Sequence, residues 1–152
     1  PEDAPDVEFY PADALDGYEE RYRLTIYGTS LYSYQVAVDR KADGATSSRA
    51  KTLHQDELIG DRRVTWRSVD YDNFKELALA ADLWNRPDER WKTPKREDSI
   101  CLDGTAIILE RLDRRGYAVS QGTMCDSVPD GFLALHSTMV RKAQLRIQRG
   151  GV

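Results

Sequence analysis

Two consecutive segments alternate apolar and polar residues, and this pattern constrains the fold more than any other feature of the sequence. Residues 22–28 and residues 32–40 both place their large apolar side chains at every second position. A period of two is typical of strands with one buried face. The link GTSL between them is short enough for a hairpin, so we expect two paired antiparallel strands.

The next segments continue this pattern less clearly. Residues 41–49 are polar and rich in turn formers, with Asp43-Gly44 as the tightest point, and they predict a loop. Residues 50–55 resemble a weak third strand and residues 62–69 a stronger fourth strand. We expect the turn between these two strands at Gly60-Asp61.

At Ser68 the hydrophobic period changes from two to about 3.6, which predicts a helix. The helix begins near Ser68, Asp70 or Asp72, which are suitable capping residues, and it ends before Pro87. The residues that share its apolar face are Phe74, Leu77, Ala78, Ala81 and Trp84.

The second half of the chain predicts a hairpin and another helix. Residues 105–112 and 117–124 form the two strands around the turn DRRG, where Gly116 takes a positive φ, and the apolar run 107–109 indicates burial on both faces. The final helix starts near Pro129 in its first turn. Its apolar face carries Phe132, Leu135, Met139 and Ala143.

The order of these elements favours an α+β fold, namely an antiparallel sheet of about five to six strands with two helices packed on one face. We expect a single domain over residues 21–148, preceded by an acidic arm over residues 1–20. The face of the sheet without helices is then available for binding.

Charge excludes one class of partner. The chain of 152 residues has a net charge of −4, and its first twenty residues carry eight acidic side chains and no basic one. Most of such a surface would repel phosphates, so nucleic acid is excluded as a partner. No apolar run approaches the roughly 18 residues of a membrane span, and we expect none.

The two cysteines, Cys101 and Cys125, lie at the ends of the second hairpin. Pairing Leu112 with Tyr117 leaves Cys101 a few residues beyond the partner of Cys125, and a turn at residues 102–104 would return it. We expect a disulfide worth about 3.5 kcal/mol in the chain-entropy model. Unrelated buried thiols and a metal site are the alternatives. A disulfide indicates a periplasmic or secreted location.

The chemistry-bearing residues predict no catalytic site. Helix neighbours such as His136 and Ser137 point in different directions, so a triad with Asp130 is excluded. Asp103 and Glu110 share a strand and turn and could act as an acid and base pair, but carboxylates in a turn and at a strand edge are usually just solvated. Phosphate loops and metalloprotease motifs are absent from the sequence, so we expect no catalytic residue, metal or cofactor.

Aromatic and acidic residues are the candidates for contact with another protein. Tyrosine on strands usually fills half-buried sheet surface, but tyrosine and tryptophan are also enriched in binding hot spots. The partner-binding residues predicted on this basis are Tyr32, Tyr34, Trp91, Asp13, Asp16, Glu19 and Glu20.

The segments FKELALAADLWNRP and CLDGTAIILERLDRRGYAV resemble a pattern of small uncharacterised bacterial envelope or secreted domains. The positions that carry it are Phe74, Leu77, Trp84, Pro87, Asp103, Gly104, Leu109, Glu110, Gly116 and Tyr117. They cover less than a third of the chain, and Ile107 or Ile108 stands where the pattern often has tryptophan. The resemblance implies an envelope location and an α+β fold, and it implies no catalytic residue.

Together these observations favour a noncatalytic protein-binding module of the bacterial envelope, such as an inhibitor or immunity protein. One alternative is a small hydrolase that uses Asp103, Glu110 or His136. Another is a structural or lipid-associated envelope component.

Overall fold

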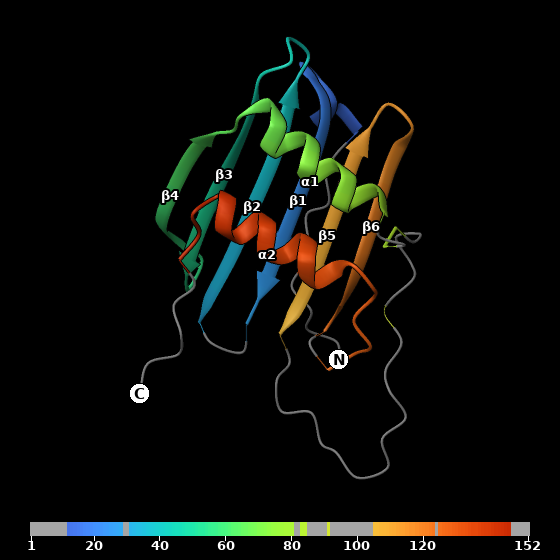
Figure 1. Ribbon diagram of the computed structural model, residues 1–152. Coiled ribbons are helices and arrows are strands. Elements are labelled where there is room, and N and C mark those ends of the chain that lie inside the picture. The colour runs from blue at the N-terminus through green and yellow to red at the C-terminus, as the bar shows by residue number, and fades with distance from the viewer. Residues whose placement is uncertain are drawn as a thin grey trace.

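The structure is a computed structural model that describes residues 12–28, 31–80, 83–84, 91, 105–123 and 125–146. It contains a six-stranded antiparallel sheet and two helices, which confirms the predicted α+β class (Figure 1). The elements in chain order are the 3-10 helix η1 (Ala12–Leu15), β1 (Tyr18–Tyr27), β2 (Tyr32–Lys41), β3 (Thr46–His54), β4 (Glu57–Thr65), α1 (Ser68–Ala80), β5 (Ala106–Asp113), β6 (Gly116–Thr123) and α2 (Phe132–Lys142).

The sheet has the strand order β4-β3-β2-β1-β5-β6, and every neighbouring pair is antiparallel. The first four strands therefore form a meander that moves away from β1, and the second hairpin joins the other side of β1. Both helices cross the same face of the sheet (Figure 1). The opposite face, called the open face below, carries neither helix. No helix among the described residues is long and apolar enough to cross a membrane.

The core fills the space between the sheet and the helices. β1 and β2 contribute the expected alternate residues, and Tyr22 makes an edge contact with Phe74 of α1 at 4.9 Å between ring centroids. The prediction for the buried face of α1 was partly wrong. Leu77, which was expected on this face, is 37% exposed, and Tyr71, which was not expected there, is fully buried. The prediction for α2 is confirmed, since Phe132, Leu135, Met139 and Ala143 are all buried.

Two of the predicted connections were wrong. β3 begins at Thr46, inside the segment expected to be a loop, and Gly60 and Asp61 lie within β4 rather than in a turn. The turn between β3 and β4 is instead at Gln55 and Asp56, which have φ angles of 49° and 64°. Two consecutive residues in the left-handed region match the twist of the flanking strands in a two-residue hairpin.

The start of β3 has polar residues on its core side, and Trp66 forms hydrogen bonds with their hydroxyl groups. Ser48 faces the core, and its hydroxyl accepts a hydrogen bond from the indole Nε1 of Trp66 at 2.8 Å. The hydroxyl of Thr46 donates to the backbone oxygen of Trp66 at 3.0 Å. These buried hydroxyls are satisfied, so a strand with little apolar pattern still packs into the core.

The second hairpin has the predicted register, with Leu112 opposite Tyr117. Ile107, Ile108 and Leu109 are all buried, as expected for burial on both faces. Cys101 lies outside the described residues, so its pairing with Cys125 stays a prediction. The acidic arm also stays untested over residues 1–11, although β1 already begins at Tyr18.

Candidate functional site

The open face of the sheet brings four residues into one row across four strands. Arg23 of β1 is opposite Ala37 of β2, Ala37 is opposite Arg49 of β3, and Arg49 is opposite Arg63 of β4. Alanine is the smallest side chain in this row, and longer side chains surround it. The row therefore has a depression over Ala37 with guanidinium groups on both sides.

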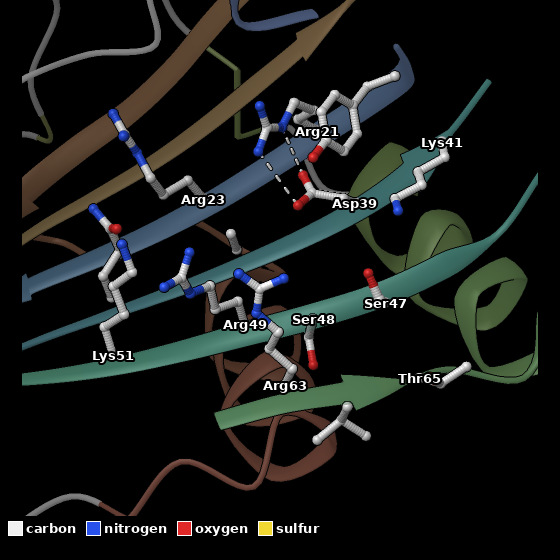
Figure 2. Close-up of a pocket in the computed structure, with 14 residues that line it drawn as sticks. Arg21, Arg23, Asp39, Lys41, Ser47, Ser48, Arg49, Lys51, Arg63 and Thr65 are labelled. Carbon is white, nitrogen blue, oxygen red and sulfur yellow. Dashed lines mark hydrogen bonds and ion pairs between the residues drawn. The ribbon is translucent and has the colours of Figure 1, made fainter. Parts of the chain in front are cut away.

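This depression is part of a groove of about 470 Å³ that crosses strands β1 to β4 (Figure 2). The cationic side chains that line this basic groove are Arg21, Arg23, Lys41, Arg49, Lys51 and Arg63, and Asp39 is the only carboxylate among the described residues of the lining. Serine, threonine and glutamine side chains complete its polar surface. A protein with a net charge of −4 thus gathers positive charge at one place on its sheet.

Three carboxylates neutralise part of this charge. Arg21 donates from Nε to Asp39 Oδ1 at 2.8 Å, as Figure 2 shows at one end of the groove. Burial raises the pKa of Asp39 in spite of the hydrogen bond from Arg21, which acts in the opposite direction. This pair holds Arg21 against the sheet and leaves it little freedom to meet a ligand.

The other two carboxylates lie next to the groove. The fully buried carboxylate of Glu110 accepts hydrogen bonds from Arg23 and from the hydroxyl of Tyr117. Arg49 donates two hydrogen bonds to Asp61, at 2.9 and 2.6 Å. The hydrogen bond from Arg49 and the nearby charges of Lys51 and Arg63 lower the pKa of Asp61.

The remaining three cations, Lys41, Lys51 and Arg63, form no ion pair with any residue that the structure describes. Lys41 and Arg63 are exposed, and Lys51 is half-buried. Side chains on strands are held more rigidly than side chains on loops. The sheet fixes the backbone positions from which these cations extend, and the groove therefore presents excess positive charge that suits an anionic group.

The position of Arg63 opposite Arg49 is unfavourable for the isolated sheet. The backbone N–H of Trp66 donates to the oxygen of Thr46, its direct neighbour on β3, at 2.9 Å. Hydrogen-bonded and non-hydrogen-bonded pairs alternate along an antiparallel ladder, so Arg49 and Arg63 form a non-hydrogen-bonded pair. Side chains are closest at such pairs, and like charges there destabilise a sheet.

None of the six predicted partner-binding residues whose side chains the structure describes lines this groove. Tyr34, Trp91 and Glu20 are buried, with 5%, 5% and 4% of their surface exposed. Tyr34 lies on the core side of β2, and Glu20 forms an ion pair with Lys75 of α1 at 3.1 Å. Buried side chains offer a partner no contact area in this structure, so the candidate site is not built on them.

Of the other four, three have side chains that the structure describes. Tyr32 is half-buried and contacts His54 at 4.7 Å between ring centroids. Glu19 forms an ion pair with Arg40 at 3.2 Å, and Asp16 is exposed. Asp13 lies in η1, and its side chain is outside the described part of the structure. Tyr32 begins β2, whereas Tyr18, next to Glu19, pairs with Lys41 at the other end of that strand, so Tyr32 and Glu19 do not share one surface.

Trp91 is a core residue rather than an exposed anchor. Its indole Nε1 donates to the hydroxyl of Ser120 at 2.8 Å, and its ring makes an edge contact with Phe132 at 4.8 Å. Its backbone N–H also donates to the oxygen of Gln121 on β6. The charged segment around Trp91 suggested a surface position, but the ring fills the space between β6 and α2.

The residues considered for catalysis are not assembled into a site. Glu110 is held by Arg23 and Tyr117, whereas the ring of His136 lies against Phe132 on α2, at 5.7 Å between centroids. Asp103 lies outside the described residues. Within the described residues, no group of three or more histidine, cysteine or acidic side chains is placed to hold a metal ion.

Comparison with known proteins does not assign this chain to a family. No protein-family model matches it, and no curated protein matches it at a significant level.

The groove residues were missed in the sequence because they lie on the polar side of alternating strands. Arg21 and Arg23, and likewise Arg49 and Lys51, are separated by one residue, so each pair shares a face. This spacing is the feature of the sequence from which the groove could have been predicted. It shows that cations share a face within one strand, but it does not show which strands are neighbours.

Proposed function

We propose that this protein is a noncatalytic protein-binding module of the bacterial envelope, such as an inhibitor or immunity protein, and that it binds an acidic surface of its partner in the basic groove. The observation that carries the proposal is the set of six cations around Ala37, three of them without an ion pair in the described structure. A sheet that only had to fold would gain stability by losing some of these charges.

The geometry of the groove favours carboxylates on a protein surface. Guanidinium groups bind carboxylates through two parallel hydrogen bonds, and Arg49 already does so with Asp61. Concentrated positive charge also speeds association with an acidic partner and selects against basic ones. Nucleic acid is a poorer candidate, because the rest of this acidic chain would repel its phosphates.

The proposed envelope location rests on the disulfide between Cys101 and Cys125. Cys125 lies two residues beyond the end of β6 at Thr123, and the described part of the chain contains no free cysteine. A disulfide persists in the periplasm or outside the cell, and it is rare in the cytosol. Titration of thiols in the denatured, unreduced protein tests this part, and two reactive thiols would contradict it.

A capture experiment tests the binding function. The oxidised protein is immobilised and exposed to a native envelope extract, and bound proteins are identified by mass spectrometry. The double variant Arg49→Glu/Arg63→Glu is compared with Arg114→Glu/Arg141→Glu, which makes the same change in net charge at exposed positions outside the groove.

We expect one stoichiometric partner that the wild type and the control variant retain and the groove variant loses. Binding should also weaken as salt is raised, because the contacts are between exposed charges. Equal capture by the groove variant and the control would overturn the assignment to the groove. The absence of any stoichiometric partner would overturn the binding function.

A further inference from the structure

The outer edge of β4 lies beside the basic groove and has no neighbouring strand in the described structure. β4 is the first strand in the order of the sheet, and seven of its nine residues are exposed. Such an edge presents a row of backbone N–H and C=O groups to another chain. The edge is therefore a second binding element next to the groove.

The ladder between β3 and β4 shows which backbone groups face outward. The hydrogen bond from Trp66 N–H to the oxygen of Thr46 fixes the alternation, so Val64 and Arg62 bond to β3. The backbone groups of Asp61, Arg63 and Thr65 then point away from the sheet. The side chains of the same three residues lie on the open face, where Arg63 and Thr65 line the groove.

The opposite edge of the sheet is different. On β6, the oxygen of Gln121 accepts a hydrogen bond from the backbone of Trp91 at 2.9 Å, and the indole of Trp91 covers Gly122. This contact occupies part of the β6 edge. Of the two edges, β4 is the one that combines outward backbone groups with an unneutralised cation.

The β4 edge also carries exposed apolar side chains. Leu58 and Ile59 are each 53% exposed, and Ile59 is the extra residue of a bulge, because Thr52 pairs with Gly60 and Leu53 pairs with Leu58. Bulges and charges usually protect sheet edges from unwanted pairing. Here the bulge protects one end only, and the segment from Asp61 to Thr65 keeps a regular register.

We infer that the partner docks by adding an extended acidic segment as a further strand along the edge of β4. This inference rests on the proposed function and specifies how the partner binds. The main chain of the segment bonds to the outward groups of Asp61, Arg63 and Thr65, and every second side chain faces the groove. A carboxylate next to Arg63 supplies the ion-pair partner that Arg63 lacks in the described structure, whereas Arg49 already has Asp61.

A pair of synthetic peptides of equal composition tests this mode. The first is the blocked peptide Thr-Glu-Thr-Glu-Thr-Glu-Thr, which places all its carboxylates on one face of a strand. The second has the same residues in the order Thr-Thr-Glu-Glu-Glu-Thr-Thr, so its charge is equal but its carboxylates lie on both faces. We expect the alternating peptide to bind at least about tenfold more tightly, because an added strand turns all three of its carboxylates to one face but divides those of the second peptide between two faces.

Amide exchange followed by NMR locates the contact. In the wild type, saturation with the alternating peptide should slow exchange of the Asp61, Arg63 and Thr65 amides by about tenfold or more. The amides of Arg62 and Val64, which already bond to β3, serve as internal controls and should change little. If the peptide does not slow exchange of the Asp61, Arg63 and Thr65 amides, strand addition is overturned.

The variant Thr65→Pro removes one outward N–H group without removing a bond to β3, and its matched control Thr65→Val keeps the N–H group. We expect the proline variant to bind the alternating peptide about tenfold more weakly and the valine variant to bind it like the wild type. Thermal unfolding confirms that both variants are folded, and the exchange measurement on the wild type does not depend on either of them.

The outcomes separate this inference from the proposed function. Both peptides could bind the wild type equally and fail to bind the variant Arg49→Glu/Arg63→Glu. This result would overturn strand addition but would keep recognition of acidic groups by the groove. The absence of binding by both peptides would overturn strand addition by an acidic segment. The capture experiment judges the proposed function independently of either peptide.

Discussion

Arg49 of β3 and Arg63 of β4 are directly opposite each other on the open face, at a position where their strands exchange no backbone hydrogen bonds. Arg49 is bound to Asp61, and Arg63 has no ion pair in the described structure. Asp61 compensates the charge of Arg49, so the uncompensated charge at this position is that of Arg63. Its presence is explained if a ligand supplies the missing negative charge.

The first prediction follows from this pair. Replacement Arg63→Thr removes the repulsion and keeps a residue with high strand propensity, so it should stabilise the protein by roughly 0.2 to 1 kcal/mol. The same variant should bind an acidic partner more weakly. The midpoint of urea unfolding measures the stability, and the capture experiment measures binding.

The replacement Lys51→Thr is the matched control for this prediction. Lys51 is directly opposite the carboxylate Asp61, so its removal takes away an attraction and relieves no cross-strand repulsion. Removal of Arg63 also takes away an attraction to Asp61, but it relieves the repulsion from Arg49 directly opposite. It should leave the free energy of unfolding unchanged or slightly lower. An increase equal to that of Arg63→Thr would mean that threonine itself, rather than charge, stabilises this surface.

The second prediction concerns the buried ion pair of Arg23 and Glu110. The side chain of Glu110 is fully buried, and that of Arg23 is 13% exposed. Replacement Glu110→Met leaves the guanidinium of Arg23 poorly solvated and without this partner, so it should lower the free energy of unfolding by about 3 to 5 kcal/mol. Urea unfolding at neutral pH measures the loss.

The double variant Arg23→Met/Glu110→Met distinguishes charge from packing. Replacing both members of a buried ion pair with apolar residues of similar volume is often neutral or stabilising. The double variant should therefore be more stable than Glu110→Met alone. A double variant that is at least as unstable as the single one would show that packing around Glu110, and not the unpaired charge, causes the loss.

The third prediction concerns Gly122 on β6. A Cβ atom at this position would lie 2.6 Å from two ring atoms of Trp91, so Gly122→Ala displaces the indole and its hydrogen bond to Ser120. Overpacking of this kind should destabilise the protein by about 1 to 3 kcal/mol. The measurement is urea unfolding, with a red shift of tryptophan emission as the local signal.

Gly60→Ala is the control for Gly122→Ala. Its Cβ would meet Thr52 at an ordinary contact distance of 3.5 Å, and its stability should change by no more than about 0.5 kcal/mol. If both glycine variants lose the same stability, contact with Trp91 is not the cause.

The sequence predicted the parts of the fold in which large apolar residues repeat with a clear period. β1, β2, β5 and α2 all have such repeats, and their buried faces are the expected ones. β3 was harder to predict because Thr46 and Ser48 face the core, and their hydroxyls are satisfied by Trp66, a residue nearly twenty positions away. Such a partner is not apparent from local sequence.

The groove could be predicted only in part for a related reason. The spacing of Arg21 and Arg23 puts both on one face of β1, but their partners come from distant segments. Arg23 meets Glu110, which is 87 residues further along the chain. Only the strand order, with β1 between β2 and β5, decides which cations are neutralised and which remain available.

The last prediction concerns pH and His136. Burial of the imidazole on α2 lowers its pKa below the ordinary value of 6.5. The unfolded chain therefore binds a proton more readily than the folded protein when the pH falls through this range. The stability associated with the neutral imidazole is present above about pH 6.5 and is lost as the pH falls toward the lower folded pKa.

Replacement His136→Gln should accordingly reduce the loss of stability between about pH 7.5 and pH 5.5. Urea unfolding of the wild type and the variant at both pH values measures the difference. His54→Gln removes the other imidazole of the chain, on β3 against Tyr32, and is the control. The control leaves the buried imidazole of His136 in place, so it should keep the part of the pH dependence that His136 causes. Identical pH dependence of His136→Gln and the wild type would contradict the assignment, since no proton would then distinguish the folded from the unfolded state at this residue.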